Sequence, residues 1–366
     1  MSLFTDFDLL PSLQATLAEK GLITPTDIQN RTIPALLDEQ SIVGVSETGS
    51  GKTLSYALPI LHLLKSLESR GLKISVDGQP RALVVVPTRE LGEQVSRVFK
   101  PFTHTTRLRV RTLLGGTTIE VAKRNIQGSF DILVATPGRL VKLLDRGMIS
   151  LVDIRVLVFD EADQMLDHGF LPDAHRIVEA CPDVFQKVLF SATISPAVQD
   201  LINDIFTDVE VIKSKGSDKL VPSLKTQNLT IKDGKRYPSL EKLLSAEVEG
   251  GTIIFTNTRE QCDKLASELK KNGHSCAIYR GEMDKVERRS NLKLFRDGKI
   301  GLLISTDLAS RGLDVDHIGR VINYHMPQHL DNYIHRVGRT ARAGREGTVI
   351  NFITERDLAL SYLKNV

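Results

Sequence analysis

The chain has 366 residues, of which 41% are hydrophobic and 25% are charged, and its formal net charge is +3. This composition is typical of a globular protein, and the length predicts two domains rather than one. Three cysteines without a CxxC pair argue against a disulfide-stabilised secreted fold and against a cysteine zinc site. No apolar run is long enough to cross a bilayer, and the near-neutral charge by itself gives no reason to expect a nucleic acid.

Short apolar runs rich in Val, Ile and Leu recur along the chain, and each ends abruptly in polar or small residues. The runs are 42–45, 82–86, 132–134, 156–159, 188–190, 253–255, 302–304 and 348–353. Helix-like stretches such as 91–99 and 259–271 lie between them. This alternation predicts an α/β fold with parallel sheets buried on both faces, and it places ligands outside the carboxyl ends of the strands.

A change of composition marks a boundary inside the chain. The segment 214–222 is rich in Gly, Ser, Lys and Pro, and it predicts a linker between a first domain over 1–213 and a second over 223–366. From Asp218 onward there are 25 Lys/Arg against 19 Asp/Glu, a net charge of +6, so residues 1–217 carry −3. A basic second half is compatible with an anionic partner, although a solvated basic face is the commoner explanation.

A glycine-rich segment, Ser46–Thr53, lies between an apolar run and a stretch of helically spaced leucines. Strand, loop and helix in this order predict a phosphate-binding loop. Gly49 and Gly51 would let the backbone approach phosphate oxygens, Lys52 would neutralise the β- and γ-phosphates, and the Thr53 hydroxyl would ligate Mg²⁺. Ser46 stands where the strict pattern has Gly, and a glycine-rich turn without a ligand is the alternative.

Two adjacent carboxylates, Asp160 and Glu161, follow the apolar run 156–159. After a phosphate-binding loop, the first is expected to be the second Mg²⁺ contact, and the second to orient or deprotonate the attacking water. An acidic helix N-terminus that only balances the helix dipole is the alternative.

These carboxylates begin the run Asp160–Asp163, which reads Asp-Glu-Ala-Asp, and the whole chain resembles the DEAD-box RNA helicases of helicase superfamily 2. The family's other motifs occur in the family's order, at Phe4, 21–29, 46–53, 87–91, 115–116, 136–139, 191–193, 253–259, 305–314 and 335–342. The resemblance covers essentially the full length. It implies two tandem RecA-like domains, each a mostly parallel β-sheet flanked by helices.

The resemblance also implies roles in ATP turnover. Gln29 would read the adenine, Lys52 and Glu161 would act in catalysis, and Arg336 and Arg339 would reach the γ-phosphate when the domains close. The nucleotide site would comprise Leu22, Thr24, Gln29, Ser46, Thr48, Gly49, Ser50, Gly51, Lys52, Thr53 and Asp314. Thr53 and Asp160 would hold Mg²⁺, partly through water. Leu22 stands where the family usually has an aromatic that stacks on adenine, and Ser46 where it usually has Ala.

A further polar set, Asp163, Ser191, Thr193 and His335, would couple the nucleotide state to domain closure, with ordinary strand-end hydrogen bonding as the alternative. The family binds RNA along its sugar-phosphate backbone, which implies little base specificity and a preference for RNA over DNA. The matching contacts are Pro87, Thr88, Arg89, Gly116, Thr136, Pro137, Arg139, Arg259, Gly281 and Thr306. For the glycines among them, tight turns are the alternative.

The resemblance therefore predicts an ATP-dependent RNA helicase that binds RNA between its domains, locally unwinds short duplexes and hydrolyses ATP to ADP and phosphate with Mg²⁺. An ATP-gated RNA clamp or assembly platform carries the same motifs and is the alternative. A DNA-directed remodeller is disfavoured because the motif set is the RNA-acting one. We expect a monomer without a membrane association, with possible ribonucleoprotein or ribosome-assembly partners. Its expected location is the cytoplasm, or the nucleus or nucleolus in a eukaryote.

Overall fold

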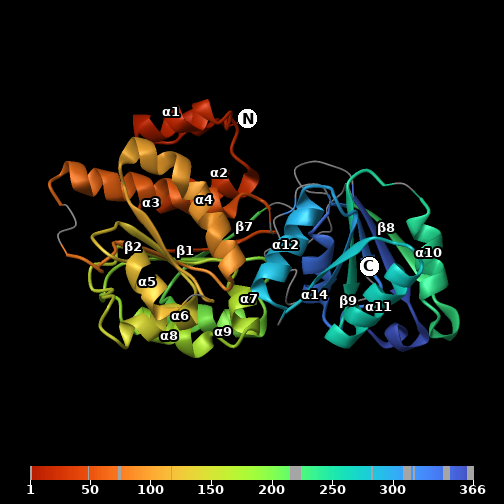
Figure 1. The fold of residues 1–366 in the computed structure, drawn as a ribbon. Helices are drawn as coiled ribbons and strands as arrows, with labels where there is room; N and C mark the ends of the chain where they lie inside the picture. The colour runs from red at the N-terminus through yellow and green to blue at the C-terminus, as the bar shows by residue number, and fades with distance from the viewer. Residues whose placement is uncertain are drawn as a thin grey trace. The chain divides into compact units, whose positions relative to one another are not determined.

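The computed structural model describes residues 2–47, 49–72, 76–116, 118–214, 224–246, 248–281, 283–307, 315, 318–340 and 347–360. The chain divides into two compact units, residues 1–217 and residues 218–366. Each unit is built on its own β-sheet with helices on both faces (Figure 1). Among the described helices, none is both long and apolar enough to span a membrane.

The first unit contains a seven-stranded sheet in the order β3-β4-β2-β5-β6-β1-β7, and every neighbouring pair is parallel. Its strands are β1 Ile42–Val45, β2 Ala82–Val85, β3 Val110–Leu113, β4 Ile132–Ala135, β5 Val156–Phe159, β6 Gln186–Ser191 and β7 Glu210–Lys213. The strands alternate with helices along the chain, as parallel connections require. The carboxyl ends of all seven strands therefore meet at one edge of the sheet.

Helices cover both faces of this sheet. Side chains of α1 to α4 pack with one set of alternating strand residues, and side chains of α5 to α9 pack with the other set. The helices are α1 Pro11–Glu19, α2 Asp27–Leu37, α3 Lys52–Ser69, α4 Arg89–Thr106, α5 Ile119–Asn125, α6 Pro137–Leu144, α7 Ala162–Asp167, α8 Leu171–Glu179 and α9 Pro196–Ile205, preceded by the short helix η1 Phe4–Asp6. Burial on both faces explains why the central strands are continuously apolar.

The second unit repeats this plan with a six-stranded parallel sheet in the order β10-β11-β9-β12-β13-β8. Its strands are β8 Leu224–Thr230, β9 Gly251–Thr256, β10 Cys276–Tyr279, β11 Leu302–Thr306, β12 Ile318–Asn323 and β13 Gly347–Ile353. Its helices are α10 Tyr237–Leu244, α11 Arg259–Lys271, α12 Lys285–Arg296 and α14 Leu330–Val337, with the short helices η2 Lys232–Gly234 and η4 Glu355–Ala359. Helices α10 and α11 pack on one face, and α12 and α14 on the other.

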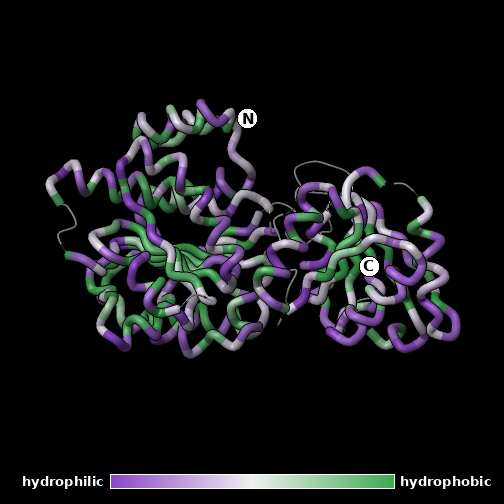
Figure 2. Tube along the Cα trace, viewed as in Figure 1, coloured by the Kyte–Doolittle hydropathy of each residue, from purple (hydrophilic) through white to green (hydrophobic). Residues whose placement is uncertain are grey.

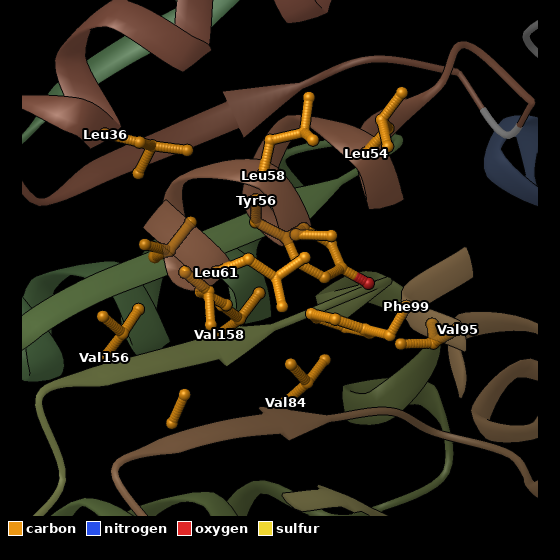
Figure 3. Close-up of a cluster of buried hydrophobic side chains, with 14 of the residues drawn as sticks. Leu36, Leu54, Tyr56, Leu58, Leu61, Val84, Val95, Phe99, Val156 and Val158 are labelled. Atoms are coloured by element: carbon orange, nitrogen blue, oxygen red, sulfur yellow. The ribbon is translucent and has the colours of Figure 1, made fainter. Parts of the chain in front are cut away.

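The hydrophobic core of each unit lies along its sheet, where Figure 2 shows the tube at its most hydrophobic. In the first unit, α3 contributes Tyr56, Leu58 and Leu61, which are at most 1% exposed. They lie against strand residues such as Val84 and Val158 (Figure 3). Full burial of one such aliphatic side chain contributes about 1.5–3 kcal/mol, so each layer of helix on sheet is strongly held.

The structure confirms the predicted fold class, and each apolar run named from the sequence falls within a strand, except that the run 82–86 extends one residue beyond β2. Five strands were not predicted, namely β3, β7, β8, β10 and β12. The edge strands β7 and β8 are largely exposed, and β12 is interrupted by Arg320, so these segments lack a continuous apolar run. Of the predicted linker 214–222, only Ser214 is among the described residues.

Candidate active site

In the first unit, the candidate residues for the nucleotide and those for RNA follow different strands of the sheet. The phosphate-binding loop follows β1, the two adjacent carboxylates follow β5, and the coupling residues Ser191 and Thr193 end or follow β6, which lies between these strands. The candidate RNA contacts follow β3, β4 and β2 on the adjoining side. Leu22, Thr24 and Gln29 lie before or at the start of α2 instead. Because the strands are parallel, the residues that follow them lie at the same edge, where ligands of open α/β sheets bind. The residues predicted after these strands thus lie together at the carboxyl-end edge of the first sheet.

The glycine-rich loop is shaped by its own backbone and side chains. Gly49 and Gly51 have φ values of 89° and 93°, a left-handed conformation that favours glycine. The Ser46 hydroxyl donates to Ser50 Oγ at 2.6 Å, and Ser50 Oγ donates to the Glu47 carbonyl at 2.8 Å. Helix α3 begins directly after the loop at Lys52, so its first free N–H groups lie at the loop. Thr48, a predicted member of the site, lies outside the described residues.

Gln29 connects the first turn of α2 to this loop. Its Oε1 accepts from Thr26 N at 2.8 Å, and its Nε2 donates to the Gly51 carbonyl at 3.1 Å. Since an amide has two lone pairs on oxygen and two hydrogens on nitrogen, each end keeps one site for a further partner. Leu22 and Thr24 precede this helix in an exposed segment, and Leu22 is 40% exposed.

Asp160 lies directly after β5 and is 2% exposed. Its Oδ2 accepts from the Tyr56 hydroxyl at 2.7 Å, whereas its Oδ1 is buried and has no hydrogen-bond partner within the described part of the chain. Burial raises the pKa of this carboxyl to about 6, although the positive charge of Lys52 opposes the rise and Glu161 adds to it. Lys52 itself is buried and donates to the Ser46 carbonyl at 2.6 Å.

A buried carboxylate oxygen without a donor fits a hard cation. Mg²⁺ in nucleotide sites is held by one or two protein oxygens together with phosphate and water, rather than by a cage of protein ligands. The described residues contain no group of three or more His, Cys, Asp or Glu side chains that would form such a cage. Asp160 and the Thr53 hydroxyl, in the first turn of α3, therefore suit Mg²⁺ bound with a nucleotide.

Glu161 adopts a conformation that is rare for a residue with a side chain. Its φ and ψ are 52° and 55°, in the left-handed region, and it is 3% exposed. Such a conformation costs of order 1–3 kcal/mol and clusters at functional sites. Its Oε2 accepts a hydrogen bond from Gln164 Nε2. The carboxylate is therefore held in place by the helix that it precedes.

Asp163 joins the loop after β5 to the loop after β6. Its Oδ2 accepts from the backbone N–H groups of Ala192 and Thr193, both at 3.2 Å, and from Thr193 Oγ1 at 3.4 Å. Its own N–H donates to Ser191 Oγ at 3.2 Å. The structure thus brings together the three predicted coupling residues of this unit, while His335 belongs to the second unit.

The candidate RNA contacts of the first unit stand at helix starts and turns. Thr88 caps α4, where its hydroxyl accepts from Leu91 N at 3.3 Å, and Arg89 pairs with Glu93 at 2.9 Å. The Thr136 hydroxyl accepts from Gly115 N at 3.0 Å. The remaining members are the buried Pro87 between β2 and Thr88, Gly116 after β3, with a φ of 85°, and Pro137 and Arg139 in the first turn of α6.

In the second unit, Gly281, Thr306 and Arg259 follow or end β10, β11 and β9, which are neighbours in the sheet. A side chain at Gly281 would meet no atom within 4 Å, so packing does not require a glycine there. Asp314 lies outside the described residues.

The two predicted phosphate-binding arginines are both 1% exposed. Arg339 Nε donates to the His335 carbonyl at 3.0 Å. Arg336 directs all five of its N–H donors to acceptors within its own unit. In this structure the donors of Arg336 are used inside its own unit, which the sequence alone did not reveal, because spacing on a helix does not tell which arginine packs inward.

Sequence reasoning missed Tyr56, which holds Asp160 from a position four residues after Lys52. Tyr56 lies among the apolar residues of α3, so the sequence pattern predicts only that it belongs to the hydrophobic core. The one available signal is that a buried tyrosine hydroxyl needs a partner. Asn257 and Asp307 lay within the quoted motifs, but no role was assigned to them.

Comparison with known proteins matches this arrangement to a family. The model of the DEAD/DEAH box helicases matches residues 26–201, and that of the helicase conserved C-terminal domain matches residues 235–344. RNA helicase CrhR of Synechocystis sp. is 35% identical over 340 residues, which cover 93% of this chain and 67% of the relative. ATP-dependent RNA helicase RhlB of Shewanella frigidimarina is 35% identical over 362 residues, which cover 96% of this chain and 81% of the relative.

Solved structures show the same likeness. Dbp5 of S. cerevisiae, bound to RNA and ADP BeF3, has a TM-score of 0.84 and 29% identity, with 97% of this chain and 90% of that chain covered. Mss116p, bound to ssRNA and AMP-PNP, has a TM-score of 0.86 and 25% identity, with 99% and 76% covered. These matches confirm two tandem RecA-like domains. Because both family models and relatives that match more than nine-tenths of this chain agree, the chain belongs to the DEAD-box family of ATP-dependent RNA helicases.

Proposed function

We propose that this chain hydrolyses ATP to ADP and phosphate in response to RNA and uses the cycle to separate short RNA duplexes. The observation that carries the proposal is the shared edge of the first sheet. The phosphate-binding loop, Asp160 and the Asp163 network lie after β1, β5 and β6, and the candidate RNA contacts follow the adjoining strands. The residues proposed for the nucleotide thus lie beside those proposed for RNA at the edge of one sheet.

The nucleotide chemistry would be divided among a few side chains. Lys52 and the N–H groups at the start of α3 would bind the phosphates, and Gln29, with a free site at each end of its amide, would contact the adenine. Thr53 and Asp160 would hold Mg²⁺, which supplies positive charge to the phosphates during transfer. Glu161 would orient the attacking water and accept its proton. From the second unit, Arg339 and Asp314 would contribute to the γ-phosphate and the ribose.

Coupling between the two ligands would run through Asp163. Its carboxylate links the loop after β5, which carries the hydrolytic residues, to the loop after β6. If ATP and RNA favour the same closed state, each must tighten the other's binding by the same factor. RNA would be held by phosphate and sugar contacts with little base preference. We further propose a monomer acting in the cytoplasm, or in the nucleus of a eukaryote, with ribonucleoprotein or ribosome-assembly partners.

The test measures ATP hydrolysis alone, with single-stranded RNA and with DNA of the same sequence, and then the separation of a short RNA duplex. We expect RNA to stimulate hydrolysis more than DNA does, and ATP to be required for strand separation. Lys52→Ala should abolish nucleotide binding and thereby both activities. Equal hydrolysis with and without RNA would refute the proposal. ATP-dependent RNA binding without strand separation would instead identify an ATP-gated clamp.

A further inference from the structure

We infer that Arg336 is a positioning residue that sets the RNA-contacting loops of the second unit, and that it does not touch the nucleotide. This inference rests on the proposed function, since it assigns the residue to the RNA side of the same cycle. Arg336 and all of its acceptors lie within the second unit.

Arg336 joins the ends of three neighbouring strands. Its Nε and Nη2 donate to Asp307, directly after β11, with the Nη2 distance at 2.9 Å. Nη2 also donates to Asn257 Oδ1 after β9 at 2.8 Å, and Nη1 donates to the His325 carbonyl after β12 at 2.6 Å. The sheet order β11-β9-β12 makes these strands adjacent. A planar guanidinium with donors in a fixed fork can connect three such points, which a single ammonium cannot.

The acceptors flank the candidate RNA contacts. Asn257 is two residues before Arg259, and Asp307 directly follows Thr306. Asn257 is further fixed by its Nδ2, which donates to the Met326 carbonyl at 2.9 Å. The relative placement of these two loops therefore depends on one buried side chain.

The orientation of Arg336 is itself determined by the sheet. Its Cζ lies 5.1 Å from the centroid of the Phe255 ring, and Nη1 donates to Asn323 Oδ1 at 3.2 Å. Asn323 donates to Asn351, and Asn351 donates to Asn228, both at 2.8 Å. This amide ladder crosses β12, β13 and β8, and Asn323 and Asn351 are fully buried. Buried polar groups that are all satisfied define one geometry, because any rotation would leave a donor unpaired.

The test compares Arg336→Lys with Arg339→Ala in the full chain, by ATP turnover across a range of single-stranded RNA concentrations. Lysine keeps a positive charge beside Asp307 but cannot span the three strand ends. For Arg336→Lys we expect the RNA concentration at half-maximal rate to rise by about tenfold or more, and the rate at saturating RNA to stay within about threefold. The variant should keep a cooperative thermal unfolding transition of the second unit, which a loss of folding there would abolish. Because the phosphate-binding loop belongs to the first unit, binding of a fluorescent ATP analogue without RNA should stay within about twofold. Arg339→Ala should instead lose rate at saturating RNA.

A second variant covers the case in which Arg336→Lys does not fold. Asn257→Ala removes one acceptor from an exposed turn and should raise the half-saturating RNA concentration in the same direction. Where both fold, the double variant should be no worse than Arg336→Lys, because the two residues act through one contact. Additive losses would overturn the inference.

The results that refute this inference differ from those that refute the proposed function. A fall of about 10³ in rate at saturating RNA, with unchanged half-saturation, would make Arg336 an arginine finger and overturn the inference alone. No change in either quantity would overturn it as well. A wild-type chain whose hydrolysis ignores RNA would refute the proposed function, and this inference with it.

Discussion

Tyr56→Phe removes a single oxygen from the core of the first unit. In Figure 3, Tyr56 lies in the buried cluster between α3 and the sheet, near Phe99. Its ring centroid is 6.5 Å from that of Phe99 and 5.8 Å from that of Phe190, and these contacts remain in the variant. The variant loses the 2.7 Å hydrogen bond to Asp160 Oδ2 and the hydroxyl's interaction with the Thr53 side chain. Neither carboxylate oxygen of Asp160 then has a described hydrogen-bonding side chain.

The size of the effect follows from the charge of the acceptor. A hydrogen bond to a charged group contributes about 1.5–3 kcal/mol, so we expect the free energy of unfolding to fall by about 2 kcal/mol. For a unit of this size that corresponds to a Tm lower by about 4–8 °C. Because burial raises the pKa of Asp160 to about 6, the carboxylate is ionised above that pH. The difference should therefore be present at pH 7.5 and shrink as pH falls through 6.

The assay is thermal unfolding in the presence of a chelator, at pH 7.5 and pH 5, together with a Mg²⁺ titration of ATP turnover. The Mg²⁺ concentration for half-maximal turnover should rise by about tenfold, a typical cost of losing a residue that orients a metal ligand. The control is Tyr324→Phe, whose hydroxyl makes no hydrogen bond with the described residues, and its effect should stay within about 0.5 kcal/mol. If the two variants lose the same stability at pH 7.5, the reasoning about Asp160 fails.

Three further predictions concern single side chains. Glu161→Gln should bind ATP normally and lose turnover by about 10²–10⁴-fold, and near-normal hydrolysis would exclude Glu161 as the base. Leu22→Phe should tighten ATP binding by up to about 1 kcal/mol through stacking, measured with a fluorescent ATP analogue, and weaker binding would refute stacking there. Burial and then Arg236 lower the pKa of His325 to about 4, so the folded unit loses stability as pH falls from 6.5. At pH 4.5 the free energy of unfolding of His325→Gln should therefore be about 2 kcal/mol larger than that of the wild type. If denaturant titrations show that both proteins lose the same stability between pH 7 and pH 4.5, this prediction fails.

Much of the fold follows from local patterns in the sequence. An apolar run that ends in a polar residue has few alternatives to a buried parallel strand, and β1, β2, β5 and β9 were predicted in this way. The same pattern placed Lys52, Asp160 and the candidate RNA contacts at strand ends, because parallel strands bring their carboxyl ends together. Edge strands such as β7 were not predicted, because a strand that is largely exposed does not require a continuous apolar run.

The division between sequence and tertiary structure is clearest at single residues. The left-handed backbone at Gly49 and Gly51 could be expected because both residues are glycines, whereas nothing in the sequence indicates that Glu161 has a φ of 52°. The sequence likewise contains two arginines on α14 and just after it. It does not indicate that the N–H groups of Arg336 are hydrogen-bonded to acceptors inside the second unit.

The sequence by itself determined the class of fold and the family, and it predicted candidate residues after several strands, because periodicity and motif spacing are local properties. Only the tertiary structure decided which polar groups are satisfied and which are left available. Tyr56 meets Asp160 across 104 residues of chain, and Arg336 meets Asn257 across 79. Contacts between such distant positions depend on how helices pack on the sheet, and packing is a property of the whole unit rather than of any segment.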